Sequence, residues 1–142
     1  MISLGIDVGQ ARIGVAFNQG SLVMAHGVLQ RTTTSAREIS EIALSRRAEQ
    51  VFVGLPVSLS GGNTRSTQDA ISFAREVSNE SNLPVFLIDE RLSTVSASAL
   101  LRAAGKNAKQ AKSIVDAEAA RVILGTALSG AKATPLEEFD AG

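Results

Sequence analysis

Cysteine is absent from the sequence, and so are tryptophan and tyrosine. Without cysteine the chain can form neither a disulfide framework nor a thiolate zinc site, and we expect it in a reducing, cytoplasmic compartment. Phenylalanine is the only aromatic residue, with five copies, which leaves little surface for stacking on unpaired bases. These absences argue against a secreted scaffold and against a protein that reads single-stranded bases by stacking.

Long apolar runs and an excess of one charge are also missing. No apolar stretch approaches the roughly 18 residues of a membrane helix, and the N-terminus carries no basic leader region, so we expect no membrane partner. Fourteen basic and fourteen acidic residues give zero net charge, which is not the basic excess of many nucleic-acid binders. With 142 residues and 44% hydrophobic content, one domain over residues 1–142 is expected.

The hydrophobic periodicity predicts an α/β protein. We expect strands at residues 2–7, 13–17, 22–29, 51–55 and 85–88, and helices at 35–49, around 70–77, at 94–104 and at 113–129. The order βββαβαβαα implies a mixed five-stranded sheet with helices on both faces. Residues after about 130 show no such pattern, and we expect a flexible tail there.

Three carboxylates occupy positions that favour chemistry. Asp7 ends the first strand, and Glu90 follows the fifth, so both should emerge at an end of the sheet. Asp116 lies in a helix among small and apolar residues, where a carboxylate is costly unless it is paired or binds a cation. Singly, each also fits a plain structural role: a turn residue for Asp7, or an ion pair with Arg91 for Glu90.

Together, these carboxylates would supply hard oxygen ligands suited to Mg²⁺ or Mn²⁺. Such clusters serve phosphodiester hydrolysis, because a bound ion activates water and a second ion, about 4 Å away, stabilises the leaving oxygen. No protein nucleophile is then required. The only histidine, His26, has no partner typical of a triad, and we interpret it as structural.

Four motifs in order resemble the bacterial YqgF/RuvX family, described as Holliday-junction resolvases or as nucleases for the 5′ end of pre-16S ribosomal RNA. The resemblance covers nearly the whole chain. The motifs are LGIDVG to RIGVA at residues 4–16, VGLP with Ser60 and Gly61 at 53–61, DERL at 89–92, and VDAEAA at 115–120.

The resemblance implies a ribonuclease H-like fold and a hydrolase acting on ester bonds. It also implies metal-binding or catalytic roles for Asp7, Glu90 and Asp116. Related resolvases commonly carry a fourth carboxylate one helical turn after the third, but Ala119 stands there, and Glu118 should point elsewhere. This departure weakens the case for vigorous two-metal resolvase activity.

Several basic residues are candidates for binding substrate phosphates. Each is equally compatible with a local ion pair or a solvated surface, although the lysines recur at three-residue spacing just before the Asp116 helix, which favours contact with a nucleic-acid backbone. The candidates are Arg12, Arg65, Arg91, Lys106, Lys109 and Lys112.

The leading hypothesis is a metal-dependent nuclease in ribosome biogenesis that cleaves structured RNA during rRNA processing. Resolution of branched DNA is the alternative; it needs two active sites and hence a homodimer rather than a monomer. A non-catalytic RNA-binding assembly module is a further alternative. An actin- or sugar-kinase-like ATPase, whose phosphate loop resembles residues 5–9, is opposed by the length, because no second domain or second phosphate motif is found.

Overall fold

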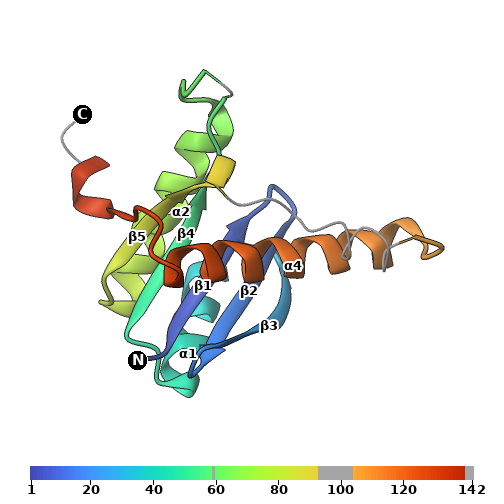
Figure 1. The fold of residues 1–142 in the computed structure, drawn as a ribbon, viewed down its shortest axis with the longest axis horizontal. Coiled ribbons are helices and arrows are strands. Elements are labelled where there is room, and N and C mark those ends of the chain that lie inside the picture. Colours follow the sequence, from blue (N-terminus) through green and yellow to red (C-terminus); the bar gives the residue numbers. More distant parts are fainter. Residues whose placement is uncertain (59, 93–103, 140–142) are drawn as a thin grey trace.

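The computed structural model describes residues 1–58, 60–92 and 104–139, which form a six-stranded mixed sheet (Figure 1). The strand order is β3-β2-β1-β4-β5-β6. β1, β4 and β5 run parallel, β2 is antiparallel to both β1 and β3, and β6 is antiparallel to β5. The strands are β1 (Ser3–Val8), β2 (Arg12–Gln19), β3 (Leu22–Gln30), β4 (Gln50–Leu55), β5 (Val85–Asp89) and β6 (Thr134–Pro135).

The helices cover the two faces of the sheet. α1 (Ser35–Arg46) and α2 (Arg65–Ser81) pack side by side on one face, and α4 (Ala108–Leu128) crosses the other (Figure 1). Short 3-10 helices η1 (Glu90–Leu92) and η2 (Leu136–Phe139) follow β5 and β6. The helix predicted at 94–104 falls on residues 93–103, outside the described part. No helix in the described ranges is long and apolar enough to cross a membrane.

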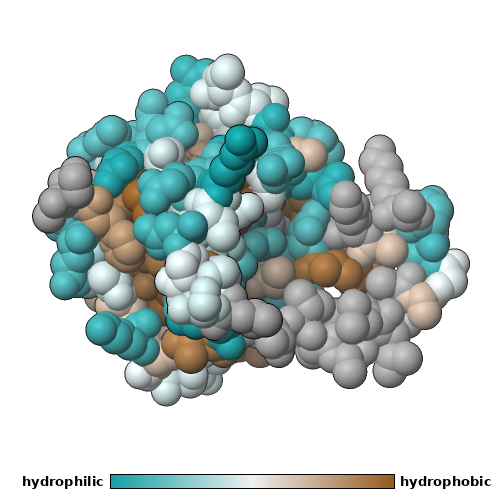
Figure 2. All heavy atoms as spheres, turned by 90° about the horizontal axis from the view of Figure 1, so that it is seen from above, coloured by the Kyte–Doolittle hydropathy of each residue, from teal (hydrophilic) through white to brown (hydrophobic). Residues whose placement is uncertain are grey.

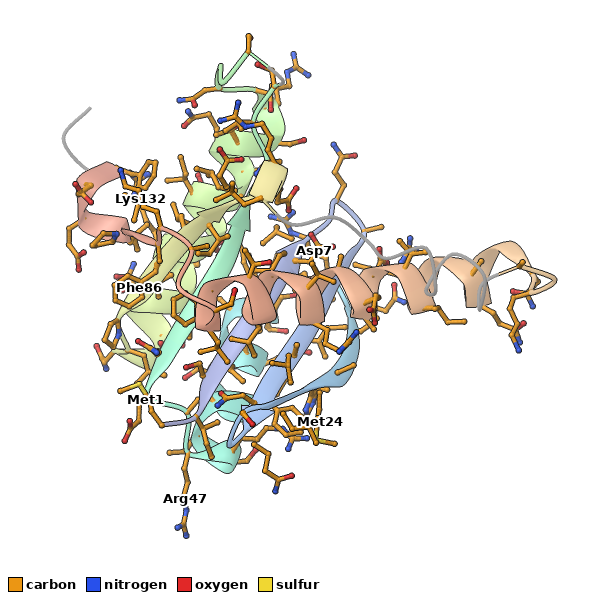
Figure 3. The ribbon with its side chains drawn as sticks, in the orientation of Figure 1. Met1, Asp7, Met24, Arg47, Phe86 and Lys132 are labelled. Carbon is orange, nitrogen blue, oxygen red and sulfur yellow. The ribbon has the colours of Figure 1, made fainter. Side chains whose placement is uncertain are left out.

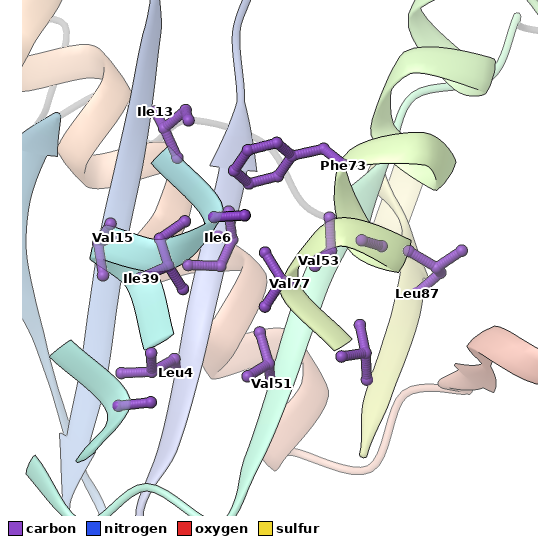
Figure 4. Close-up of a cluster of buried hydrophobic side chains, with 14 of the residues drawn as sticks. Leu4, Ile6, Ile13, Val15, Ile39, Val51, Val53, Phe73, Val77 and Leu87 are labelled. Carbon is purple, nitrogen blue, oxygen red and sulfur yellow. The ribbon is translucent and has the colours of Figure 1, made fainter. Parts of the chain in front are cut away.

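Branched aliphatic side chains fill the space between the sheet and the α1–α2 pair (Figure 4). On each strand these residues alternate with others, because every second side chain points to the same face of the sheet. Each fully buried side chain of this size contributes about 1.5–3 kcal/mol to folding. Fully buried members are Leu4, Ile6, Ile13, Val15, Ile39, Val51, Val53 and Val77.

A smaller cluster lies under α4 on the opposite face. Ile123 and Leu124 of the helix are buried against Ile88 and Phe52 of the sheet. The Phe52 ring stacks on Phe86 with 5.5 Å between centroids. Where α4 crosses β1 and β2, Gly5 and Gly14 face it in place of large side chains.

The C-terminal residues add a sixth strand to the five that were predicted. Thr134 and Pro135 pair with β5 as a sixth strand, opposite Leu87 and Phe86. Leu136 is then buried, and the carbonyl of Phe139 accepts a 2.7 Å hydrogen bond from Arg75 of α2. A two-residue strand is too short to produce a recognisable alternation, which is why the sequence pattern failed here.

Helix α4 begins five residues before the predicted start at 113. Asn107 caps it: its side chain accepts a 2.8 Å hydrogen bond from the amide of Gln110, whose own side chain reaches back to the amide of Asn107. This reciprocal pair is a capping box. The pattern of Asn followed three residues later by Gln was present in the sequence and could have fixed the boundary.

Candidate active site

Helix α4 lies directly on the backbone of the sheet, because glycines face it. A Cβ atom at Gly14 would collide with the main-chain carbonyl oxygen of Asp116. At Gly5, a Cβ would lie 2.6 Å from the Cβ of Leu124. Since Gly14 is paired with Asp7 in the β1–β2 register, this close approach brings the Asp116 turn of the helix over the end of β1.

Asp7 and Glu90 meet at the carboxyl end of the parallel strands, where Figure 3 shows Asp7 beside α4. Asp7 lies near the end of β1, and Glu90 directly follows β5, with β4 between them. The intervening residue on β4 is Gly54, where a Cβ would lie only 2.7 Å from Oε1 of Glu90. The absence of a side chain at Gly54 lets the Glu90 side chain lie over β4 and reach Asp7.

The two carboxyl groups share a hydrogen bond and have perturbed affinities for protons. Burial, followed by the charge of Asp7 and the hydrogen bond to it, raises the pKa of Glu90 to about 7. Burial also raises the pKa of Asp7, the hydrogen bond from Glu90 opposes that rise, and the charge of Asp116 adds to it. Without a cation, Glu90 therefore keeps its proton to a higher pH than an ordinary glutamate and can donate it to Asp7.

Asp116 is close enough for its charge to act on Asp7, but its side chain binds an arginine. Nε of Arg12 donates to Oδ2 of Asp116 at 2.9 Å, and the two side chains are 21% and 23% exposed. Within the residues that the structure describes, no three Asp, Glu, His or Cys side chains gather tightly enough to hold a metal ion. The structure thus brings Asp7 and Glu90 together and leaves Asp116 beside them, bonded to Arg12.

Arg91 of η1 and Arg65 of α2 are two other predicted substrate contacts. The guanidinium of Arg91 is paired with Asp89, at 2.6 Å from Nη2 to Oδ2, and lies close to Gly61 of the loop before α2. Arg65 is the first residue of α2 and lines a cavity of about 220 Å³ beside Arg31.

The predicted lysine contacts are placed only in part. Lys106 is exposed in the turn that precedes α4. Lys109 and Lys112 belong to the first turns of α4, but their side chains lie outside the described part of the structure. Seen from above, the end of the molecule that carries the carboxyl ends of the parallel strands is mainly hydrophilic (Figure 2).

Arg31 is a residue that sequence reasoning missed. Its guanidinium binds both carboxylate oxygens of Asp69, at 2.6 and 2.8 Å, and also donates to the carbonyl of Gly9 at 3.0 Å. This pairing lowers the pKa of Asp69. Arg31 fixes the turn that follows Asp7, yet its partners lie 22 and 38 positions away, so no local pattern could have revealed the role.

Two other sequence interpretations can be compared with the structure. Glu118 is buried, and its carboxylate is bonded to Arg121 one turn later on α4, at 2.6 Å, so it is engaged there as a structural group. Nδ1 of His26 accepts a 3.0 Å hydrogen bond from Arg46, whose guanidinium also stacks on the ring of Phe17. His26 thus has a structural partner at the opposite end of β2 from Arg12.

Comparison with known proteins places the chain among nucleases. The model of the RuvX family, described as Holliday junction resolvase, matches residues 1–130. A protein of Leifsonia xyli subsp. xyli, named "Putative pre-16S rRNA nuclease", is 45% identical over 94% of this chain and 88% of its own length. One of the same name from Maridesulfovibrio salexigens is 36% identical over 90% of this chain and 98% of its own length.

Solved structures agree on the fold. RuvC of T. thermophilus in complex with a Holliday junction substrate superposes with a TM-score of 0.58, at 17% identity, over 95% of this chain and 99% of that chain. Thermus thermophilus RuvC alone gives 0.57 at 19% identity. At such identities the likeness concerns the fold alone, and it confirms the predicted ribonuclease H-like architecture.

Proposed function

Because the chain belongs to the RuvX family, we propose that it is a metal-dependent endonuclease whose substrate is the 5′ end of pre-16S ribosomal RNA. The observation that carries this proposal is the half-buried, hydrogen-bonded Asp7–Glu90 pair at the carboxyl end of the parallel strands, with Asp116 beside it. Ionising both carboxyl groups of such a close, half-buried pair is unfavourable unless a cation compensates the two charges in place of the shared proton.

Asp7, Glu90 and Asp116 are the proposed ligands of Mg²⁺ or Mn²⁺. All three offer carboxylate oxygens, the donors that these hard cations prefer. Such an ion, when bound, lowers the pKa of a water molecule so that hydroxide is available near neutral pH. Asp7, Glu90 and Asp116 would hold the ion, and Glu90 would give up the shared proton to solvent when the ion binds.

Positive side chains around the carboxylates are the proposed contacts for phosphate groups. Charged hydrogen bonds from arginine are stronger than neutral ones and match the geometry of two phosphate oxygens. Their positions on the turn after β1, the start of α2, η1 and the start of α4 would follow a nucleic-acid backbone across the end of the sheet. The proposed set is Arg12, Arg65, Arg91, Lys106, Lys109 and Lys112.

The test compares the protein with its Asp7→Asn and Glu90→Gln variants. Pre-16S RNA is incubated with each protein in Mg²⁺ or Mn²⁺ and then in EDTA, and cleavage is read on a gel. We expect cleavage only with a metal ion and a fall of at least about 100-fold in both variants, since each removes a metal-binding charge. Glu138→Gln, on exposed η2, is the matched control and should keep full activity.

Two results would contradict the proposal in different ways. Full activity of the Asp7→Asn variant would show that the metal centre does not lie at Asp7. RNA binding that survives EDTA, without any cleavage by the unmodified protein, would favour the non-catalytic assembly module. A melting curve for each variant separates loss of chemistry from loss of fold.

Resolution of a four-way DNA junction is the second candidate, favoured by the family description. Symmetric cleavage of two strands requires two active sites, and therefore a homodimer. A four-way junction is included in the same assay, and the mass of the protein is measured by light scattering. Junction cleavage by a dimer, with uncut RNA, would transfer the proposal from RNA to branched DNA.

A further inference from the structure

The ion pair between Arg12 and Asp116 has fixed main-chain supports on both sides. The carbonyl of Arg12 accepts a 2.9 Å hydrogen bond from the amide of Gly9, which closes the tight turn after β1. Asp116 is held because the main chain of α4 rests on Gly14. Both side chains are about four-fifths buried, so water screens this pair less than an exposed one.

The charges of the three proposed metal ligands and of Arg12, which together form the centre, do not cancel. When ionised, Asp7, Glu90 and Asp116 carry three negative charges, and Arg12 carries one positive charge that arginine does not lose in proteins. The set therefore has a net charge of minus two, which one divalent cation neutralises. Two other ion pairs, Arg91 with Asp89 and Arg31 with Asp69, combine charges of opposite sign and add no net charge to this count.

The geometry also distinguishes the two oxygens of Asp116. Oδ2 accepts the hydrogen bond from Arg12, whereas Oδ1 has no hydrogen-bond partner within the described residues. Oδ1 is therefore the oxygen of Asp116 that would be left for a cation held with Asp7 and Glu90, while Oδ2 stays bonded to the guanidinium. In a two-metal site a second ion lies about 4 Å from the first, and the Arg12 guanidinium takes one carboxylate oxygen that such an ion would need.

We propose that Arg12 takes the place of a second metal ion, so that the centre binds one divalent cation with Asp7, Glu90 and Asp116. Nε of Arg12 stays on Asp116, and its terminal nitrogens, which make no hydrogen bond within the described residues, are left to bind the substrate phosphate. They supply positive charge where the leaving oxygen becomes negative. This inference rests on the proposed metal-dependent function.

The test counts bound Mn²⁺ ions without substrate, by electron paramagnetic resonance of the free ion and by calorimetry. An ion is assigned to the centre if the unmodified protein binds it and the double variant Asp7→Asn/Glu90→Gln does not. We expect one such ion in the unmodified protein and two in Arg12→Gln, because removal of the guanidinium leaves a second position open and one negative charge unbalanced. Arg12→Lys keeps the positive charge and should still bind one ion.

The matched control is Arg46→Gln, which removes a positive charge at the other end of β2, where Phe17 pairs with Leu4. It should bind one ion. Arg12→Met, which keeps the apolar part of the side chain, is the second variant in case Arg12→Gln melts below the assay temperature, and it should bind two.

The outcomes separate this inference from the proposed function. Two ions in the unmodified protein would overturn the role of Arg12 and leave the metal-dependent nuclease intact. One ion in both Arg12→Gln and Arg12→Met would also overturn it, since the guanidinium would not be occupying a cation position. No ion at the centre of the unmodified protein would overturn the proposed function and this inference together.

Discussion

The two faces of the sheet are built on different principles. The face covered by α1 and α2 is filled with Leu, Ile and Val side chains that hold the layers apart. The face covered by α4 carries Gly5, Gly14 and Gly54 where the helix approaches. The first face stabilises the fold through buried area. The second face buries less apolar area, and its glycines let α4 approach the sheet closely. The carboxylates carried by β1, by the end of β5 and by α4 lie near one another because these glycine positions have no side chains.

The largest effect should come from truncating one isoleucine on each face. Ile39→Ala and Ile123→Ala remove the same atoms from fully or almost fully buried positions, and each should lower the free energy of unfolding by about 2–5 kcal/mol. Only Ile123→Ala should also reduce cleavage, by as much as about 100-fold, because α4 carries Asp116 and small misplacements slow chemistry. Urea unfolding and the cleavage assay measure the two effects. Equal losses of cleavage activity in the two variants would contradict the prediction that only the α4 face positions the carboxylates.

The next effect concerns pH. The pKa of Glu90 is raised from 4.5 to about 7 in the folded protein, so the folded state holds this proton more tightly than the unfolded chain. Its contribution to stability is present below about pH 4.5 and is lost as pH rises through about 7. Without added metal, Glu90→Gln should flatten this part of the stability profile, by roughly 2–3 kcal/mol. Thermal melts from pH 4 to 8 measure it, and an unchanged profile would contradict the shared proton.

Smaller still is the expected cost of adding one methyl group to the α4 face. Gly14→Ala places a Cβ against the carbonyl oxygen of Asp116, and the helix must shift outward at a cost of about 1–3 kcal/mol. Cleavage should fall more than stability, because the shift moves Asp116 away from Asp7. Chemical denaturation and kinetics of the same sample compare the two losses. Retained activity would mean that contact with the backbone is not what positions Asp116.

The smallest effect should have the opposite sign. Gly125 lies inside α4, and a Cβ there would meet no atom within 4 Å in the described residues. Gly125→Ala should therefore stabilise the protein by about 0.5–1 kcal/mol, since alanine loses less backbone entropy in a helix, and it should leave cleavage unchanged. A lower melting temperature for this variant would contradict the view that a glycine is needed only where α4 and the sheet backbone are in contact, as at Gly14.

The sequence predicted those features that depend on local pattern. Alternating residues predicted β1 to β5, and the strand-end positions of Asp7 and Glu90 predicted that they would lie close together. Features that depend on distant partners escaped. No local signal could reveal that Arg12 pairs with Asp116, 104 positions away, or that Gly54 makes room for Glu90. The expected roles of Lys109 and Lys112 stay predictions, as does the full ligand set of the metal ion.

The short strand β6 has a consequence for solubility. β5 is a run of apolar residues with no charge before Asp89, and without β6 its backbone amides would form an open edge able to recruit strands from other molecules. Pro135 covers Phe86 in the register and has no N–H to donate to a further strand. This proline therefore ends the sheet next to the residues that precede Glu90, and a chain truncated before Thr134 should self-associate at concentrations where the intact protein stays dispersed.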